Sequence, residues 1–505
     1  MATINTRASV LGIKVETTEG TPALPAATTD FIAQQDDLTM EPSFEQLENA
    51  ELKNSLGMAK SIVGAESPTC SFSHYLRHSG TEGDAPAYGS TILKAIFGTE
   101  TVDADEETCD AASTVSVIKL TADGDDHPRG SGMLIKDATN GYSIRPAHSV
   151  ATNDVTLGFN LSDAPAAGVT VGKSVTYSVA DTGHQTLSLW EYLGNGGAVE
   201  LISGARPVSM DISLEANQLA NASFSFEGIG FYFNPMTITD TNKYIDYNEG
   251  GASSTVTLTT KTYKDPHELA DHIATVLDAD ATATITCTYS DSTGKYTITS
   301  DGATFELEWK AGTNGADGTD THVGTLLGFA DTADDTGATS YTSDSAVDWS
   351  AAYTPSYEDV DPIVCKGFEC YIGEADDNDC FDPSSVSISM STPKVDTMSL
   401  CEDTGKSGSV ISSREVTIDI VTLLPQHCAD RFRRMRENTE TRFFIAGGPK
   451  SGGNYEAGKC FGIYAPNCTV TSISIADNEG RAEMSMSLKT YVDDDGNGEF
   501  YLFFV

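Results

Sequence analysis

Apolar and polar residues alternate along VSMDISL at positions 208–214. The same period of two returns in SFSF at 223–226, in VTIDI at 416–420 and in MSMSL at 484–488. Successive side chains of a β-strand point to opposite faces, so each stretch predicts a strand with one buried and one exposed face. The residues between these stretches are rich in Thr, Ser, Gly and Asp, which favour turns. We therefore predict a mainly β fold.

Helical patterns are few. The clearest covers residues 266–277, where apolar residues share one face, with Asp265 as the N-cap and Pro266 at the first helical position. A second helix is expected over 425–437, with apolar residues toward a core and arginines in solvent. A third, shorter helix is expected over 88–97. The helices are thus additions to a β protein.

The chain has 505 residues, which is more than one ordinary hydrophobic core serves. Residues 239–348 shift in composition to Thr, Asp and Ala, and they combine one helix with several strands, so we expect an inserted α+β domain there. Residues 101–186 form another β-rich stretch, which is either a second insertion or an elaboration of the first unit. The remaining segments, 1–100, 187–238 and 349–505, are expected to form one discontinuous core.

Charge excludes two classes of partner. Asp and Glu total 74 against 30 Lys and Arg, which gives a formal net charge of −44. This charge repels nucleic-acid phosphates, and DNA-binding activity is therefore not expected. No apolar window of about 18 residues is present, so membrane insertion is not expected. The first residues lack a signal-peptide pattern, and assembly in a cytoplasm is the expectation.

The sequence contains ten cysteines but no CxxC pair, so a zinc site built from cysteines is not expected. Seven of them lie in the segment from Cys365 to Cys468. They are either buried small apolar residues or disulfide partners after release from a reducing cell, and we expect most to be unpaired.

No catalytic or cofactor-binding pattern is present. There is no Gly-x-Ser-x-Gly motif, and Gly405-Lys406-Ser407 has Leu400 where a phosphate-binding loop needs glycine. The acidic run 493–499 does not fit a calcium loop and is better explained as a solvated turn. We therefore predict no catalytic residue, no metal site and no cofactor, and a protein that is not an enzyme. A hydrolase with carboxylates paired only in the fold stays a minor alternative.

A family resemblance begins near the N-terminus. TTEGTP at 17–22, ENAELKNSLG at 48–57 and KSIVGAES at 60–67, followed by an alternating strand at 69–76, resemble the opening of phage tail tube (major tail) proteins. FEGIGFY at 226–232 resembles a later strand of that family. The order of these segments matches as well.

Residues 239–348 carry a resemblance of their own. NKYIDY at 242–247, TLLGF at 325–329 and DDTGATSY at 334–341 resemble a module that recurs in phage structural proteins.

The resemblance implies a tail-tube-type β-sandwich with a flanking helix, whose subunits form six-fold rings that stack into a hollow tube for DNA. The implied partners are further copies of the chain and other tail proteins at the tube ends, and the implied location is the virion. An acidic tube would let DNA slide, because carboxylates repel the duplex. The alternative is a capsid decoration or host-binding (adhesion) protein of the virion.

Candidate inter-subunit contacts come from two segments. Residues 45–67 resemble the family's long loop that reaches a neighbouring subunit or ring. The concentrated basic patch lies at 431–436, and in so acidic a protein its expected partners are carboxylates of a neighbouring subunit rather than DNA. The candidate contact residues are Glu48, Glu51, Lys53, Lys60, Arg431 and Arg434.

Overall fold

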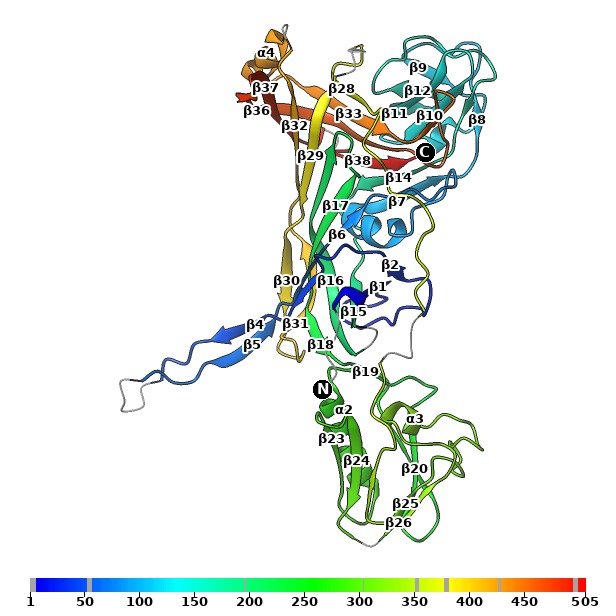
Figure 1. Ribbon diagram of the computed structural model, residues 1–505, viewed down its shortest axis with the longest axis vertical. Coiled ribbons are helices and arrows are strands. Elements are labelled where there is room, and N and C mark those ends of the chain that lie inside the picture. The colour runs from blue at the N-terminus through cyan, green and yellow to red at the C-terminus, as the bar shows by residue number, and fades with distance from the viewer. Residues whose placement is uncertain are drawn as a thin grey trace.

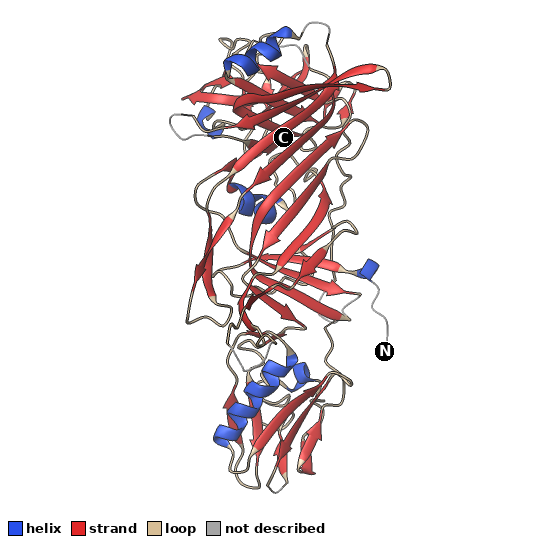
Figure 2. Cartoon of the chain, turned by 90° about the vertical axis from the view of Figure 1, so that its left-hand side faces the viewer, coloured by secondary structure: helices blue, strands red, loops and turns tan. Residues whose placement is uncertain are grey.

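The computed structural model shows an elongated, mainly β molecule (Figures 1 and 2). It describes residues 6–51, 57–194, 197–302, 304–349, 354–376, 381–425, 428–493 and 498–505. A β-rich body occupies most of the length, a smaller domain extends from one end, and a long hairpin projects sideways (Figure 1). The predicted β class is thus confirmed.

Eight strands of a 17-stranded antiparallel sheet form one continuous ladder along the body, and we call this ladder the long sheet. The ladder joins strands from both ends of the chain, and among its adjacent pairs β16–β17 and β36–β37 are short hairpins between consecutive strands. In order, the strands are β3 (Thr39–Glu41), β6 (Thr69–Tyr75), β17 (Asn221–Glu227), β16 (Ala198–Glu215), β29 (Pro383–Ser391), β32 (Glu415–Leu423), β37 (Arg481–Thr490) and β36 (Phe461–Asn478).

Strands β16 and β36 each belong to two sheets. Their second halves lie in the long sheet, and their first halves turn into sheets that cover its buried face. β16 passes from one sheet to the other beside Gly204. The φ of this residue is 62°, which favours glycine, and the Ile229 side chain occupies the space that a Cβ atom would need. The covering strands are β1 (Val10–Val15), β2 (Phe31–Ile32), β15 (Leu187–Leu193), β18 (Gly230–Phe233), β28 (Glu369–Gly373), β33 (Thr441–Gly447), β38 (Tyr501–Phe504), β14 (Ser174–Val179) and β7 (Gly98–Asp103).

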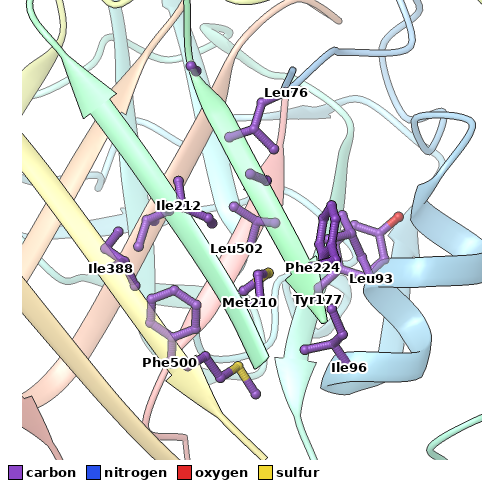
Figure 3. Close-up of a cluster of buried hydrophobic side chains, with 14 of the residues drawn as sticks. Leu76, Leu93, Ile96, Tyr177, Met210, Ile212, Phe224, Ile388, Phe500 and Leu502 are labelled. Carbon is purple, nitrogen blue, oxygen red and sulfur yellow. The ribbon is translucent and has the colours of Figure 1, made fainter. Parts of the chain in front are cut away.

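The main core fills the space between the long sheet and its cover (Figure 3). Met210 and Ile212 of the stretch 208–214 are 0% and 1% exposed, as the alternation predicts. Phe224 packs beside them and faces the short helical segment. That segment comprises η2 (Gly89–Leu93) and α1 (Lys94–Phe97), where the third helix was expected. Truncating a buried aromatic residue such as Phe224 to alanine lowers the free energy of unfolding by about 3–5 kcal/mol.

The β-rich stretch predicted at 101–186, called the first insertion below because it precedes residues 239–348, contains a six-stranded sheet of its own over residues 107–171. One apolar cluster consists of residues of the insertion alone. A second apolar cluster lies between the insertion and the strands β33, β36 and β38 of the cover. β7 and β14, which flank it in the sequence, pair with each other in the cover. The insertion's elements are β8 (Glu107–Thr108), β9 (Val117–Lys119), η3 (Gly124–Asp126), β10 (Gly132–Asp137), β11 (Gly141–Ala151), β12 (Asp154–Leu157) and β13 (Thr170–Val171).

The smaller end domain has an independent core around α2 (Pro266–Asp280). The predicted cap is confirmed, because the Asp265 carboxylate accepts a hydrogen bond of 2.9 Å from the Glu268 backbone N–H. The remaining elements are β19 (Met236–Thr237), β20 (Tyr244–Asn248), β21 (Ser254–Thr257), β22 (Thr262–Tyr263), β23 (Ile285–Ser290), β24 (Lys295–Ser300), β25 (Phe305–Leu307), α3 (Gly324–Leu327), β26 (Asp335–Ala338) and β27 (Ser340–Thr342).

The second predicted helix begins later than expected. α4 spans Ala429–Glu437 and does not start at residue 425, because the Leu424 N–H still pairs with Ala482 O beyond the end of β32. The backbone there continues a strand ladder, which excludes a helical turn. No α4 residue is fully buried, but Met435, one of the apolar residues predicted to face a core, is partly buried and packs against the main core.

Candidate assembly surfaces

The outward face of the long sheet is polar, and we call it the serine face. The sheet register places Ser209, Asp211 and Ser213 of β16 opposite serines of β29, with further serines and acids on the next strands. In Figure 2, which views this side, the strands lie in front of the short helices of the body. Its central residues are Ser71, Ser73, Ser209, Asp211, Ser213, Glu215, Ser223, Ser225, Ser385, Ser387, Ser389, Ser391, Glu415, Thr417, Asp419, Ser485, Ser487 and Lys489.

Acids outnumber bases on the serine face. Lys489 Nζ lies 2.7 Å from Glu415 Oε1, and both side chains are about half exposed, so this pair contributes little to stability. Asp211 is exposed between Ser223 and Ser389, and Asp419 accepts a hydrogen bond from the Ser487 hydroxyl. The face therefore combines short hydroxyls with a net negative charge.

The long sheet ends in edges that the described residues leave open. The second half of β36, residues 471–478, pairs with β37 on one side only. At the opposite end β3 pairs only with β6. Unpaired strand edges present N–H and C=O groups that another chain can pair with.

A long hairpin projects from the body (Figure 1). It consists of β4 (Phe44–Leu47) and β5 (Ile62–Glu66), and all four residues of β4 are exposed. Leu47 and Ile62 lie directly opposite each other and are 48% and 59% exposed. A two-stranded hairpin alone is at best marginally stable in water, so this one has the properties of an element that packs on another chain.

A second hairpin, which the sequence analysis missed, packs at the base of the first. It comprises β30 (Lys394–Met398) and β31 (Lys406–Ile411). The Glu66 backbone N–H donates to Thr404 O, and Lys406 Nζ donates to Ser67 Oγ at 2.7 Å. Hydrogen bonds from two buried lysines lower the pKa of Asp396 against the opposing effect of burial. Exposed apolar residues of this hairpin are the paired Val395 and Val410, and Met398 and Leu400 near its tip.

The candidate contact residues fall into two separate groups. Glu48, Glu51 and Lys60 lie between β4 and β5 and are exposed, whereas Lys53 lies outside the described residues. Arg431 and Arg434 belong to α4, at the far end of the body (Figure 1).

The α4 arginines already have contacts within their own chain. Arg434 is 13% exposed at its side chain, and it pairs with Asp430 at 2.8 Å and Glu374 at 3.2 Å. Hydrogen bonds from Arg434 and Arg433 lower the pKa of the Asp430 carboxyl. Arg431 lies over the Phe381 ring at 4.5 Å. Arg434 is therefore less solvated than the sequence pattern predicts.

Two further clusters bring ionisable residues together, and all of their members are buried except the half-buried Glu200. Glu191 on β15 faces Glu200 on β16, and burial, with the charge of Glu200, raises the pKa of Glu191 to about 7. Asp103, Glu107 and His127 form the other cluster. Burial raises the pKa of Asp103 to about 6 although the His127 charge opposes the shift. Neither cluster was indicated by sequence spacing.

Most cysteines were expected to be unpaired, and the free thiols are those of Cys70, Cys109, Cys287, Cys365, Cys401, Cys428, Cys460 and Cys468. None of the helices in the described part of the chain has the length and apolarity that a membrane crossing requires. No curated protein matches the chain.

Residues 6–262, half of the sequence, match the model of a family described as phage tail tube protein. The match runs from Thr6 to the first residue of β22 and includes the projecting hairpin, the helical segment and β16. The chain therefore belongs to the phage tail tube protein family and is a structural protein of the virion tail.

Proposed function

We propose that the chain assembles into stacked hexameric rings that form the tail tube, through which DNA passes during ejection. The observation that carries this proposal is the serine face, a broad and negatively charged sheet surface opposite the main core. In a closed ring this face lines the lumen. Its carboxylates repel the duplex phosphates, so DNA meets no fixed binding site as it moves.

The layer order supports an exterior position for the first insertion. The serine face and the main core lie on opposite sides of the long sheet, the covering sheet follows, and the insertion packs on the outer side of that cover. A ring with the serine face inward therefore carries this insertion outward. We assign residues 101–186 and 239–348 as the two insertions and 1–100, 187–238 and 349–505 as the tube core.

Ring closure and stacking use the open edges and the hairpins. Pairing of strand edges between subunits satisfies free backbone groups, and closure removes edges that would otherwise aggregate. The hairpin of β4 and β5 reaches a neighbouring subunit or ring, with Glu48, Glu51, Lys53 and Lys60 at its contacts. Arg431 and Arg434 lie at a second interface, and other tail proteins bind the tube ends. Assembly takes place in the host cytoplasm, where thiols stay reduced.

Negative-stain microscopy of the purified full chain at high concentration tests the proposal. Hollow stacked rings of six-fold symmetry are the expected result. Discrete particles without a lumen, with a monomeric or trimeric mass in sedimentation, would refute the tube and favour a capsid decoration or host-binding protein. No enzymatic step is part of the proposed role.

A further inference from the structure

An open groove lies beside β3, at one edge of the long sheet. It has a volume of about 860 Å³ and is lined by β3, β15 and the first half of β16. Its charged lining residues are one arginine, Arg7, and four acids, Asp36, Glu41, Glu191 and Glu200, and we call it the acidic groove. Negative charge is thus concentrated beside a sheet edge that the described residues leave open.

Two carboxylates of the acidic groove, Glu191 and Glu200, are withdrawn from solvent. Glu191 is 7% exposed and Glu200 is half-buried. Glu191 lies two residues from Leu189 of the main core, so both side chains are on the core side of β15. Burial raises the pKa of both carboxyls, and no lysine or arginine of the described residues offsets the shift for either one. Because a buried carboxylate is costly until a cation pairs with it, the single chain leaves a site for a cationic side chain.

The complementary charge lies at the opposite edge of the long sheet, on α4. This helix packs beside β36, and Met435 of α4 and Ile473 of β36 both pack against the main core. α4 is therefore on the core side of the sheet, as the acidic groove is. Arg433 is 62% exposed and pairs only with the exposed Asp430, which contributes little to stability. Arg436 is exposed and forms no ion pair with another described residue, so both arginines can contact another chain.

The two open edges are staggered by an amount that suits a closed ring. The ladder through Met40 of β3 crosses β16 at Pro207. The ladder through Ser474, in the open half of β36, crosses β16 at Glu215. This offset of eight residues is about 26 Å along the strands, and the eight strands together are about 38 Å wide. Joining the edges of successive copies at these levels gives a strand tilt of about 35°, which is typical of closed barrels.

We propose that α4 of one copy docks at the acidic groove of the next copy, where Arg433 and Arg436 pair with Glu191 and Glu200. This proposal rests on the ring of the proposed function and names one of its contacts. When the β36 edge meets the β3 edge of the next copy, α4 and the groove come to the same side of the joined sheet. A guanidinium carries five donors in a planar fork, which suits a pair of carboxylates. Each copy offers the helix at one edge and the groove at the other, and such a head-to-tail contact can close a ring.

The test is a charge-reversal cycle on the full chain, followed by sedimentation velocity over a range of concentrations. Arg436→Glu and Glu200→Arg are each expected to raise the concentration needed for ring assembly at least tenfold, because each places like charges in the contact. The variant with both changes is expected to recover to within about threefold of the wild type, since the pair is restored in reverse. Lys119→Glu is the matched control and should assemble like the wild type, because Lys119 is 45% exposed on the first insertion.

The outcomes separate this contact from the tube itself. Rings that form equally well with Arg436→Glu, or no recovery in the combined variant, would overturn the docking of α4 and leave the tube standing. A wild type that does not associate at any concentration would refute both the tube and this contact.

Cross-linking keeps the proposal testable if a charge-reversed variant does not fold. Arg436→Lys keeps the positive charge and supplies an amine, which carbodiimide joins to a carboxylate in contact with it. Copies labelled with different isotopes are mixed, cross-linked under assembling conditions and digested for mass spectrometry. The expected product joins position 436 of one copy to a peptide with Glu191 or Glu200 of another. Cross-links from position 436 to other carboxylates only, or none at all, would contradict the proposal.

Discussion

The projecting hairpin offers the sharpest test of assembly, through the double substitution Leu47→Asp with Ile62→Asp. The two side chains lie opposite each other and are 48% and 59% exposed in the single chain. Complete burial of such a side chain contributes about 1.5–3 kcal/mol, so burying the exposed half of each contributes about 1 kcal/mol. Losing both weakens each hairpin contact by about 2 kcal/mol, or about 30-fold in its dissociation constant. Two carboxylates placed in an apolar contact add a desolvation cost.

The assay is sedimentation velocity combined with negative-stain microscopy over a range of protein concentrations. The variant is expected to remain a folded single chain at concentrations where the wild type forms tubes. The control is Thr286→Asp with Thr288→Asp, which adds the same charge at exposed positions of β23 in the end domain. If the hairpin variant forms tubes at wild-type concentrations, the hairpin does not make the assembly contact. Equal melting temperatures of variant and wild type would exclude misfolding as the cause of a loss.

Deleting residues 242–348 is expected to leave tubes intact in the same microscopy, because the end domain has its own core, whereas deleting residues 46–66 is expected to abolish them. Because the pKa of Glu191 is raised from 4.5 to about 7, the folded chain holds this proton more tightly than the unfolded chain, and stability falls as pH rises from about 4.5 to 7. Glu191→Gln should therefore be more stable than the wild type by about 1–3 kcal/mol in urea unfolding at pH 8, and this gain should disappear at pH values below about 4.5. Reversing the charge of the serine face with Asp211→Lys and Asp419→Lys should give assembled tubes that retain DNA at low salt and release it at high salt, as measured by co-sedimentation; tubes that ignore DNA would count against a lumenal position.

The sequence predicts those elements whose cause is local. The period of two at 208–214 places Met210 and Ile212 in the core, and the cap at Asp265 marks the start of α2 within one residue. The beginning of α4 could not be predicted, because it depends on a ladder contact between residues 424 and 482 that only the tertiary structure creates.

The functional residues, too, could be predicted from the sequence only where the signal is local. The resemblance of residues 45–67 to a reaching loop indicated an exposed segment, and the structure shows a hairpin there. The cluster of Asp103, Glu107 and His127 has no sequence signal, since its members are separated by spacings that fit no ligand template. Their proximity arises when β7 enters the cover while β8 starts a different sheet.

The choice of serine on the long sheet points to a role beyond strand stability. β-branched residues such as threonine and valine suit a strand better, and the buried face of β32 does carry Val416, Ile418 and Ile420. The opposite face of the adjacent β29 carries four serines in succession at alternate positions. Serine side chains bury less area between neighbouring strands than threonine or valine would, and they leave a flat surface of hydroxyl groups. Such a surface forms no pocket for a base and, with scattered carboxylates, no fixed contact for a phosphate. This combination suits the proposed lumenal position, in which a duplex would slide past the face, whereas folding of the sheet alone does not call for it.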